Sequence, residues 1–390
     1  MRIILFSGKG GVGKTTLAAA SAARAASLGH RTLVMSTDAA HSLGDSLALK
    51  IGPEPTRVAP NLDAMEIDVQ HELDREFGPI RDFLTQFFKG QGLDEVVADE
   101  MAILPGMEEL FSLLRVADLA HGGHYDLLLV DCAPTGETLR MLAAPDVLRF
   151  YFRKIFPVQR VLARTVRPLA PMVTSLPVPK DDVFAALKRL YERIERLDPL
   201  LRDPQITSIR IVLSLEKMVI AESERLFTYL GLYGYSVDAV IANRVLPEAA
   251  QAKGAYFERW GKAQAGHLKR VRQGFSSMPL LESPLGEEEV MGLELLTRLS
   301  AEVYRERDPL SVFHVCRPPK VEKQGNGYVF SFDLPFASSD RLTAYAAGDE
   351  LSVTIDNWRR NIVLPRSLSG REVKEARLRG GRLRVVFGGR

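Results

Sequence analysis

Eight consecutive residues near the N-terminus have the types and spacing that hold a phosphate chain. Residues Gly8–Thr15 are GKGGVGKT, which satisfies the pattern G-x-x-x-x-G-K-T. Glycines let backbone N–H groups turn toward phosphate oxygens, and the N-terminus of a following helix adds the positive end of its dipole. In this pattern Lys14 reaches the β- and γ-phosphates, and the Thr15 hydroxyl ligates Mg²⁺. The sequence therefore predicts a site for a nucleoside triphosphate with Mg²⁺.

The segments on either side of this loop are predicted to be a strand and a helix. Arg2–Ser7 is an apolar run, and Lys14–Leu28 is alanine-rich with apolar residues at helical spacing. Further apolar runs suit strands that are buried on both faces of a mostly parallel sheet. These runs are Arg31–Thr37, Tyr125–Val130, Ile209–Leu215 and Val237–Ala242. The fold class is therefore expected to be α/β, with the mostly parallel sheet of a P-loop nucleotide-binding protein.

The rest of the chain predicts two additions to this sheet. Residues from about 70 to 119 and from about 145 to 201 are rich in Phe, Leu and Met at helical spacing, which indicates helical insertions. After Asp308-Pro309 the pattern changes to short alternating stretches between Gly, Pro and Asp turns, which indicates antiparallel strands. We therefore expect a nucleotide-binding domain over residues 1–310, a linker over 311–319 and a small all-β domain over 320–390.

Composition narrows the class of protein and its setting. The 390 residues carry a formal net charge of +2, so nucleic acid is not expected as a partner. The two cysteines, Cys132 and Cys316, are far apart, which excludes a disulfide framework and favours a reducing, cytoplasmic setting. The sequence does not distinguish the cytoplasm from a plastid stroma. No apolar run is long enough for a membrane span, so stable membrane insertion is not expected either.

Three ordered motifs resemble one family. GKGGVGKTT at Gly8–Thr16, STDAAHSLGD at Ser36–Asp45 and DCAPTGET at Asp131–Thr138 are similar to the nucleotide motifs of the arsenite-pump and tail-anchored-protein-targeting ATPases, which have a deviant Walker A loop. The resemblance spans roughly residues 1 to 305. It implies ATP hydrolysis by a two-fold homodimer, in which Lys9 reaches the nucleotide of the partner subunit. ATP or ADP and Mg²⁺ are the implied cofactors.

The resemblance also implies roles for individual residues. Asp38 would position the attacking water, Asp131 would hold Mg²⁺ through water, and Asn243 would read the adenine base. Taken alone, an aspartate or asparagine after a strand is also a common turn residue. Lys9, Lys14 and Asp38 are the implied catalytic groups, and Thr15 and Asp131 the implied metal ligands. The implied nucleotide contacts are Gly8, Lys9, Gly10, Gly11, Val12, Gly13, Lys14, Thr15, Thr16 and Asn243, and the implied switch residues are Asp38, His41, Ser42, Asp45, Asp131, Pro134, Thr135 and Gly136.

The chain departs from the family pattern at several positions. Ala39 stands where proline is usual and Glu137 where many members have histidine, which puts the switch kinetics in doubt. No cysteine lies between Arg244 and His267, so the zinc-bridging C-x-x-C of the eukaryotic targeting factors is missing and zinc is not expected. The metalloid-binding cysteines and the second P-loop half of the arsenite pumps are missing too. Arsenite is therefore not expected as the effector.

In the targeting family, the helical insertions form a groove for the transmembrane helix of a client protein. The corresponding aromatic residues here are Phe83, Phe87, Phe88, Phe152 and Phe156. A groove that closes with ATP could bind an apolar helix and release it after hydrolysis. Aromatic residues at helical spacing are equally typical of an ordinary helical core, and the sequence alone does not separate exposed from buried phenylalanine.

The last seventy or so residues resemble the α-crystallin sandwich of small heat-shock proteins, through Tyr328–Pro335, Leu351–Ile355, Asn361–Pro365 and Gly381–Phe387. The leading hypothesis is a homodimeric Mg²⁺-ATPase that targets or chaperones hydrophobic, tail-anchored membrane proteins. An ATPase subunit that energises anion export is one alternative, and a positioning ATPase of the partition class on a membrane or nucleoid is another. Positioning ATPases usually lack a long Phe-rich insertion, which favours the first hypothesis.

Overall fold

The structure is a computed structural model that describes residues 1–390 except 39–41, 95–96, 99–106, 155–180, 252–253, 318, 366 and 389–390. The side chains of residues 69–77, 107–109, 147–154 and 251 are not described either. The chain divides into two compact units: residues 1–66, 123–139 and 201–390 form the first, and residues 67–122 and 140–200 the second. Across the described helices, none has the length and hydropathy of a membrane span.

An eight-stranded sheet organises the first unit, in the order β3-β4-β2-β5-β1-β6-β7-β8. Its central strands are mostly apolar and are buried along their whole length, as parallel pairing with helices on each side requires. All neighbouring strands pair in parallel except β3, which pairs antiparallel with β4. The prediction of a mostly parallel α/β sheet is confirmed. The strands are β1 (Arg2–Ser7), β2 (Thr32–Ser36), β3 (Thr56–Ala59), β4 (Leu62–Glu66), β5 (Leu127–Asp131), β6 (Thr207–Ser214), β7 (Val237–Val245) and β8 (Leu280–Pro284).

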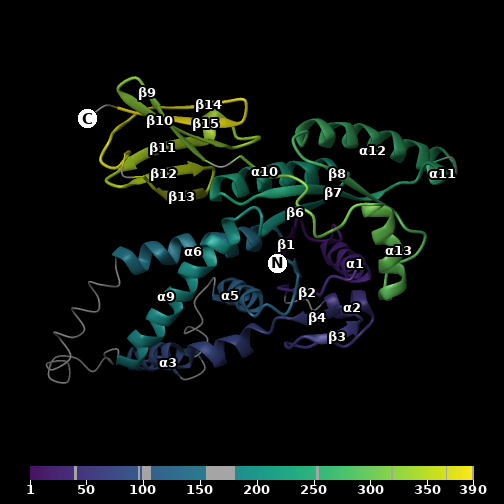
Figure 1. The fold of residues 1–390 in the computed structure, drawn as a ribbon, viewed down its shortest axis with the longest axis horizontal. Coiled ribbons are helices and arrows are strands. Elements are labelled where there is room, and N and C mark those ends of the chain that lie inside the picture. The colour runs from purple at the N-terminus through teal and green to yellow at the C-terminus, as the bar shows by residue number, and fades with distance from the viewer. Residues whose placement is uncertain are drawn as a thin grey trace. The chain divides into compact units, whose positions relative to one another are not determined.

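Helices cover both faces of this sheet (Figure 1). The connection from β1 moves toward β2 and the one from β6 moves the other way, so right-handed crossovers put their helices on opposite faces. Helix α1 (Lys14–Ser27) packs with α13 (Gly292–Tyr304) on one face, and α10 (Lys217–Tyr233) lies with α12 (Ala255–Gly274) on the other. Two short helices, α2 (Ser42–Leu47) and α11 (Glu248–Gln251), complete this set.

The second unit is helical. It contains α3 (Val69–Gly90), α5 (Met107–His121) and most of α6 (Thr135–Lys154) and α9 (Asp181–Arg202). Helices α3 and α5 contact each other, and Arg193 of α9 forms an ion pair with Asp118 of α5. Leu114 and Leu197 are among its buried residues. The predicted insertions cover about residues 70–119 and 145–201. Helices α3, α5 and α9 lie within two residues of these bounds, whereas α6 begins earlier, at Thr135. Residues 155–180 fall outside the described part.

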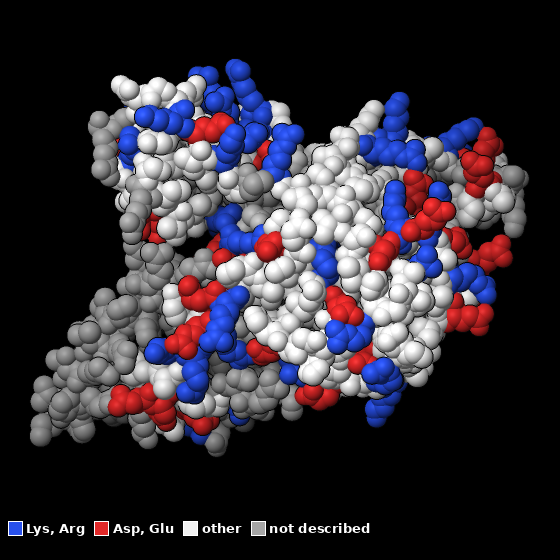
Figure 2. All heavy atoms as spheres, viewed as in Figure 1, with Lys and Arg blue, Asp and Glu red and all other residues white. Residues whose placement is uncertain are grey.

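The C-terminal part of the first unit is an all-antiparallel pair of sheets, which confirms the predicted small β domain. One sheet has the order β14-β15-β10-β9 and the other β11-β12-β13. Alternate side chains such as Leu351, Val353 and Val385 are fully buried and belong to the core of the sandwich. Lys and Arg side chains gather over this sandwich (Figure 2). The elements are β9 (Lys320–Gln324), β10 (Gly327–Asp333), the 3₁₀ turn η1 (Ser339–Arg341), β11 (Leu342–Ala347), β12 (Glu350–Ile355), β13 (Trp358–Val363), β14 (Val373–Arg379) and β15 (Arg382–Phe387).

The sandwich is fastened to helix α10 by polar and aromatic contacts. The Tyr229 hydroxyl donates to Asp356 over 2.8 Å, and the Arg360 guanidinium donates to the carbonyl of Leu232 over 2.6 Å. Trp358 packs on Tyr229 and Tyr233, with ring centroids 5.7 and 6.3 Å away. Burial of this much aromatic surface, together with charge-assisted hydrogen bonds, indicates a specific interface between the sandwich and the helix.

A buried ion cluster holds the segment that leads from the sheet to the sandwich. Asp238 on β7 accepts from Arg210 on β6 over 3.2 Å and from Arg2 on β1 over 3.5 Å, and both Asp238 and Arg210 are fully buried. Arg210 also donates to the carbonyl of Pro309 over 2.7 Å and lies 4.5 Å from the ring centre of Phe313. The cluster therefore ties residues 309–313 to the centre of the sheet.

Candidate nucleotide-binding and catalytic site

The phosphate loop joins the end of β1 to the start of α1. At two of its glycines, a side chain would clash with neighbouring atoms. A Cβ on Gly8 would lie 2.2 Å from the carbonyl oxygen of Val212. Gly13 has φ +92°, in the left-handed region, and a Cβ there would lie 2.3 Å from Nδ2 of Asn243. Lys14 is buried, with Nζ 3.5 Å from the carbonyl of Lys9. The loop therefore places backbone N–H groups and one lysine at the N-terminus of α1, as an anion site needs.

A cavity of about 620 Å³ opens over this loop, within the size range of small-molecule sites. It brings together the phosphate loop, Asp38 after β2, the start of α2, Pro134 after β5 and Asn243 on β7. The predicted site residues that line it are Gly10, Gly11, Gly13, Lys14, Thr15, Thr16, Asp38, Ser42, Asp45, Pro134 and Asn243. Of the other predicted residues, Gly8, Lys9, Val12, Asp131, Thr135 and Gly136 do not line the cavity, and His41 lies outside the described residues.

Thr15, Ser42 and Asp131 form an oxygen cluster at the bottom of the site. The Thr15 hydroxyl donates to Oδ2 of Asp131 over 2.7 Å and lies 3.1 Å from the Ser42 hydroxyl. Oδ1 of Asp131 is buried without a hydrogen-bond partner among the described residues. Burial raises the pKa of Asp131 to about 6, although the Thr15 hydrogen bond and the charge of Lys14 oppose that shift. Hard oxygen ligands and an unsatisfied carboxylate oxygen fit Mg²⁺, which would neutralise phosphate charge when bound.

The two segments with the predicted switch residues are connected through Asp131. The backbone N–H of Thr37 donates to the carbonyl of Asp131 over 2.9 Å, and the N–H of Asp38 donates to the Ser36 hydroxyl over 3.2 Å. Asp38 is half-buried and faces the cavity from the end of β2. After β5, Thr135 and Gly136 form the first turn of α6. A shift of the carbonyl of Asp131 would therefore reach the backbone next to Asp38.

Asn243 lies inside β7 and its side chain is bonded at both ends. Nδ2 donates to the carbonyl of Val12 over 2.8 Å, and Oδ1 accepts from the N–H of Arg244 over 2.9 Å. The amide thus braces the phosphate loop in this structure, and its role as a base reader stays a prediction. Sequence reasoning did not identify Arg244 or the segment 283–291, which also line the cavity. Arg244 has φ +56°, a strained backbone conformation that the sequence does not predict.

The predicted client-groove residues are only partly described. Phe83, Phe87 and Phe88 lie on α3 and are each partly exposed. Ring centroids are 6.4 Å apart for Phe83 and Phe87 and 5.7 Å apart for Phe87 and Phe88, so the three rings form one contact cluster. Phe152 lies on α6 without a described side chain, and Phe156 lies outside the described residues.

A family model for anion-transporting ATPases matches residues 1–305, and a model described as an HSP20-like domain found in ArsA matches residues 325–387. The chain belongs to the anion-transporting ATPase family. This confirms the resemblance noted in the three motifs and in the C-terminal strands. It also makes the chain an ATPase.

Relatives extend this similarity over the whole length. A putative arsenical pump-driving ATPase 1 of Aquifex aeolicus is 40% identical over 386 residues, covering 97% of this chain and 98% of that protein. A putative arsenical pump-driving ATPase of Chlorobaculum tepidum is 39% identical over 390 residues, with 99% and 96% covered. The ATPase get3 of Botryotinia fuckeliana is 29% identical over 308 residues, covering 77% of this chain and 88% of that protein. The alignment with the ATPase get3 therefore leaves about a quarter of this chain unmatched.

Proposed function

We propose that this ATPase works as a two-fold homodimer in which Mg²⁺-ATP closes the subunits around an apolar helix of a client protein, and hydrolysis opens them again. The observation that carries the dimer is the position of Lys9. Its carbonyl accepts from Lys14, yet Lys9 is not among the described residues that line the nucleotide cavity of its own chain. The Lys9 side chain is half-buried and not fully enclosed, so it is available to meet the nucleotide of a second subunit.

Within each subunit, the remaining catalytic groups would bind the phosphate charge, orient the attacking water and hold Mg²⁺. Lys14 at the N-terminus of α1 would bind the phosphate oxygens, and Asp38 would orient the attacking water from the end of β2. Thr15 and Asp131 would hold Mg²⁺. Because the backbone of Thr37 is bonded to the carbonyl of Asp131, a change at the metal site would move Asp38 and the start of α2 together.

The aromatic cluster on α3 supports a hydrophobic client. Phe83, Phe87 and Phe88 are partly exposed although together they carry a large apolar area, and an exposed apolar cluster of this kind is typical of binding surfaces. Residues four apart on one helix present the i, i+4 spacing that packs against another helix. An apolar helix is therefore the partner chemistry that the cluster fits.

Arsenite export is the alternative that the names of the two bacterial relatives favour. Trivalent arsenic is held by thiolates, which must converge on one point. Cys132 is fully buried, and that burial raises its pKa. Cys316 lies before β9, in the segment that leads from the sheet to the sandwich, and lines a different cavity. The two thiols of one chain therefore do not form a metalloid site. Stimulation of ATP hydrolysis by arsenite would favour export, and no stimulation is expected.

A labelled peptide tests the client proposal. The Asp38→Asn variant, which should bind ATP without hydrolysing it, is titrated into a fluorescein-labelled 20-residue Leu/Ala helix, and anisotropy is recorded with ATP or with ADP. We expect binding with ATP that Phe83→Ser with Phe87→Ser weakens by about tenfold or more. Met218→Ser is the matched control, because Met218 is 74% exposed on α10. Equal binding with ADP, or equal loss in the control, would contradict the proposal.

A further inference from the structure

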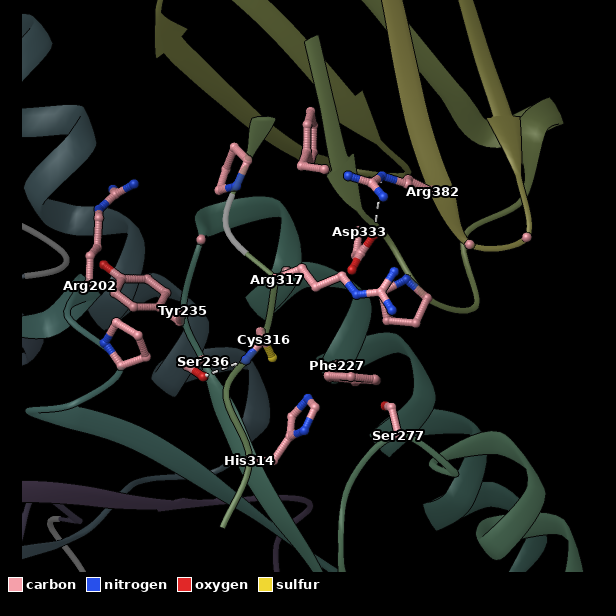
Figure 3. Close-up of a pocket in the computed structure, with 18 of the residues that line it drawn as sticks. Arg202, Phe227, Tyr235, Ser236, Ser277, His314, Cys316, Arg317, Asp333 and Arg382 are labelled. Atoms are coloured by element: carbon pink, nitrogen blue, oxygen red, sulfur yellow. Dashed lines mark hydrogen bonds and ion pairs between the residues drawn. The ribbon is translucent and has the colours of Figure 1, made fainter. Parts of the chain in front are cut away.

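A second cavity, of about 740 Å³, lies within the first unit between the nucleotide-binding part and the sandwich. Its walls come from α10, the ends of α9 and α12, the end of β10, the turn before β15 and the residues His314, Cys316, Arg317 and Pro319. It shares none of its lining residues, all of them described, with the nucleotide cavity. Figure 3 shows side chains from these separate segments turned toward one space. The cavity is therefore a separate candidate site of small-molecule size.

Positive charge converges on this cavity. Arg202, Arg317, Arg360 and Arg382 line it, whereas Asp333 is the one carboxylate among its described lining residues. Two of these guanidiniums meet at Gly234, where a Cβ would lie 3.1 Å from Nη1 of Arg360 and 3.5 Å from Nη1 of Arg202. The two guanidiniums therefore concentrate positive charge on one side of the cavity, and such a concentration of charge attracts anions.

Three of the four arginines are held in place by the protein. Arg360 donates to the carbonyl of Leu232 over 2.6 Å, Arg202 lies 5.5 Å from the ring centre of Tyr235, and Arg382 donates to the Ser331 hydroxyl over 3.1 Å. Arg382 is also 3.6 Å from Asp333. Such fixed guanidiniums lose little conformational freedom when they bind an oxyanion.

Arg317 differs from the other three. It forms no hydrogen bond or ion pair with the residues that the structure describes, and Figure 3 shows it and Arg382 on two sides of Asp333. Its planar fork of donors matches the oxygens of a phosphate group. The rest of the wall is largely apolar, with Phe227, Tyr235 and Phe332 beside the arginines. The cavity thus combines an anion-binding side with an aromatic side.

We propose that this junction cavity binds a small organic phosphate, whose phosphate group is held by Arg317 and its neighbouring arginines and whose flat or apolar part packs on Phe227, Tyr235 and Phe332. Because its walls belong to both the nucleotide-binding part and the sandwich, the bound anion strengthens the contact between them. This site is independent of the proposed client and of hydrolysis at the phosphate loop.

Calorimetry on the full chain tests the site, with Mg²⁺-ADP saturating the phosphate loop. Phenyl phosphate is the probe, and benzoate and inorganic phosphate are its comparison ligands. We expect phenyl phosphate to bind most tightly of the three, and Arg317→Gln to weaken it by about tenfold or more. Arg379→Gln is the matched control, because Arg379 is an exposed sandwich arginine outside the cavity. No binding of phenyl phosphate, or equal weakening by the two variants, would overturn the proposal.

Cys316 gives a second readout at the same place, because it lines the cavity and is half-buried. The other cysteine of the chain, Cys132, is fully buried, so maleimide labelling of the native protein reports on Cys316. Saturating phenyl phosphate is expected to slow this labelling by about tenfold in the parent chain and much less in Arg317→Gln. Unchanged labelling despite calorimetric binding would place the ligand elsewhere and refute the assignment.

Discussion

Removing the carboxylate of Asp238 is expected to destabilise the folded chain by about 3 to 5 kcal/mol, because two guanidiniums would stay buried without their counter-charge. Asp238 and Arg210 are fully buried, and the Arg2 side chain is 6% exposed. Arg210 would keep neutral acceptors at Tyr304 and Pro309, over 3.1 and 2.7 Å. These hydrogen bonds place the expected cost of Asp238→Ala near the lower end of that range.

Asp126→Ala is the comparison that isolates the effect of burial on the cost of losing an ion pair. Asp126 also pairs with an arginine, Arg31, over 2.7 Å, but the two side chains are 39% and 55% exposed. Solvent screens such a pair, so its loss should cost less than about 1 kcal/mol. Urea unfolding followed by far-ultraviolet circular dichroism gives both values. Costs that agree to within about 1 kcal/mol would refute the reasoning, because burial would then have no effect.

The loss of the Asp238 carboxylate should also loosen the segment that leads from the sheet to the sandwich. Arg210 fixes the carbonyls of Pro309 and Ser311, so a displaced guanidinium would free the segment that leads to the sandwich. Amide hydrogen exchange of residues 310–313 is expected to speed up in Asp238→Ala at concentrations of urea well below the transition. Exchange at the parent rate would show that the cluster does not hold this segment.

Two further substitutions test single contacts. Gly13→Ala should weaken nucleotide binding by about tenfold or more, since its methyl group would meet Nδ2 of Asn243 on a backbone with φ +92°; titration with a fluorescent ADP analogue measures this, and parent affinity would contradict it. Tyr229→Phe should cost about 1.5 kcal/mol at neutral pH by removing the donor to Asp356. Burial raises the pKa of Tyr229 from 10.0 to about 12, so this stabilisation is complete below pH 10 and is lost as the pH rises through about 12. The difference in unfolding midpoint between the parent chain and Tyr229→Phe should therefore narrow above pH 10. A difference that stays constant with pH would contradict the assignment.

The sequence predicts the parts of the fold that local patterns specify. Arg2–Ser7 forms a strand over the predicted bounds, and the alanine-rich helix begins at Lys14 as expected. Both follow from continuous apolar runs and from the glycine loop between them. The strands around Tyr328 and Leu351 are found within two residues of their predicted bounds, because alternation and turn residues mark them.

Long-range arrangements were not predictable in the same way. Arg2, Arg210 and Asp238 are more than 25 residues apart, and each would pass as an ordinary surface charge in the sequence. Only the order of the parallel strands puts their side chains on neighbouring positions. The junction cavity is hidden for the same reason, because its arginines come from four segments of the chain. Nor does any local pattern mark the segment 283–291 as a wall of the nucleotide cavity.

Subunit mixing tests the central claim most directly. Lys9→Ala leaves the nucleotide site of its own chain intact but removes the lysine offered to a partner, whereas Lys14→Ala disables its own site and keeps Lys9. Each variant alone should be inactive. If Lys9 acts across the dimer, an equimolar mixture has one complete site in each mixed dimer and regains about a quarter of the parent ATPase rate. A mixture as inactive as its components would contradict the account, because Lys9 would then serve only its own chain.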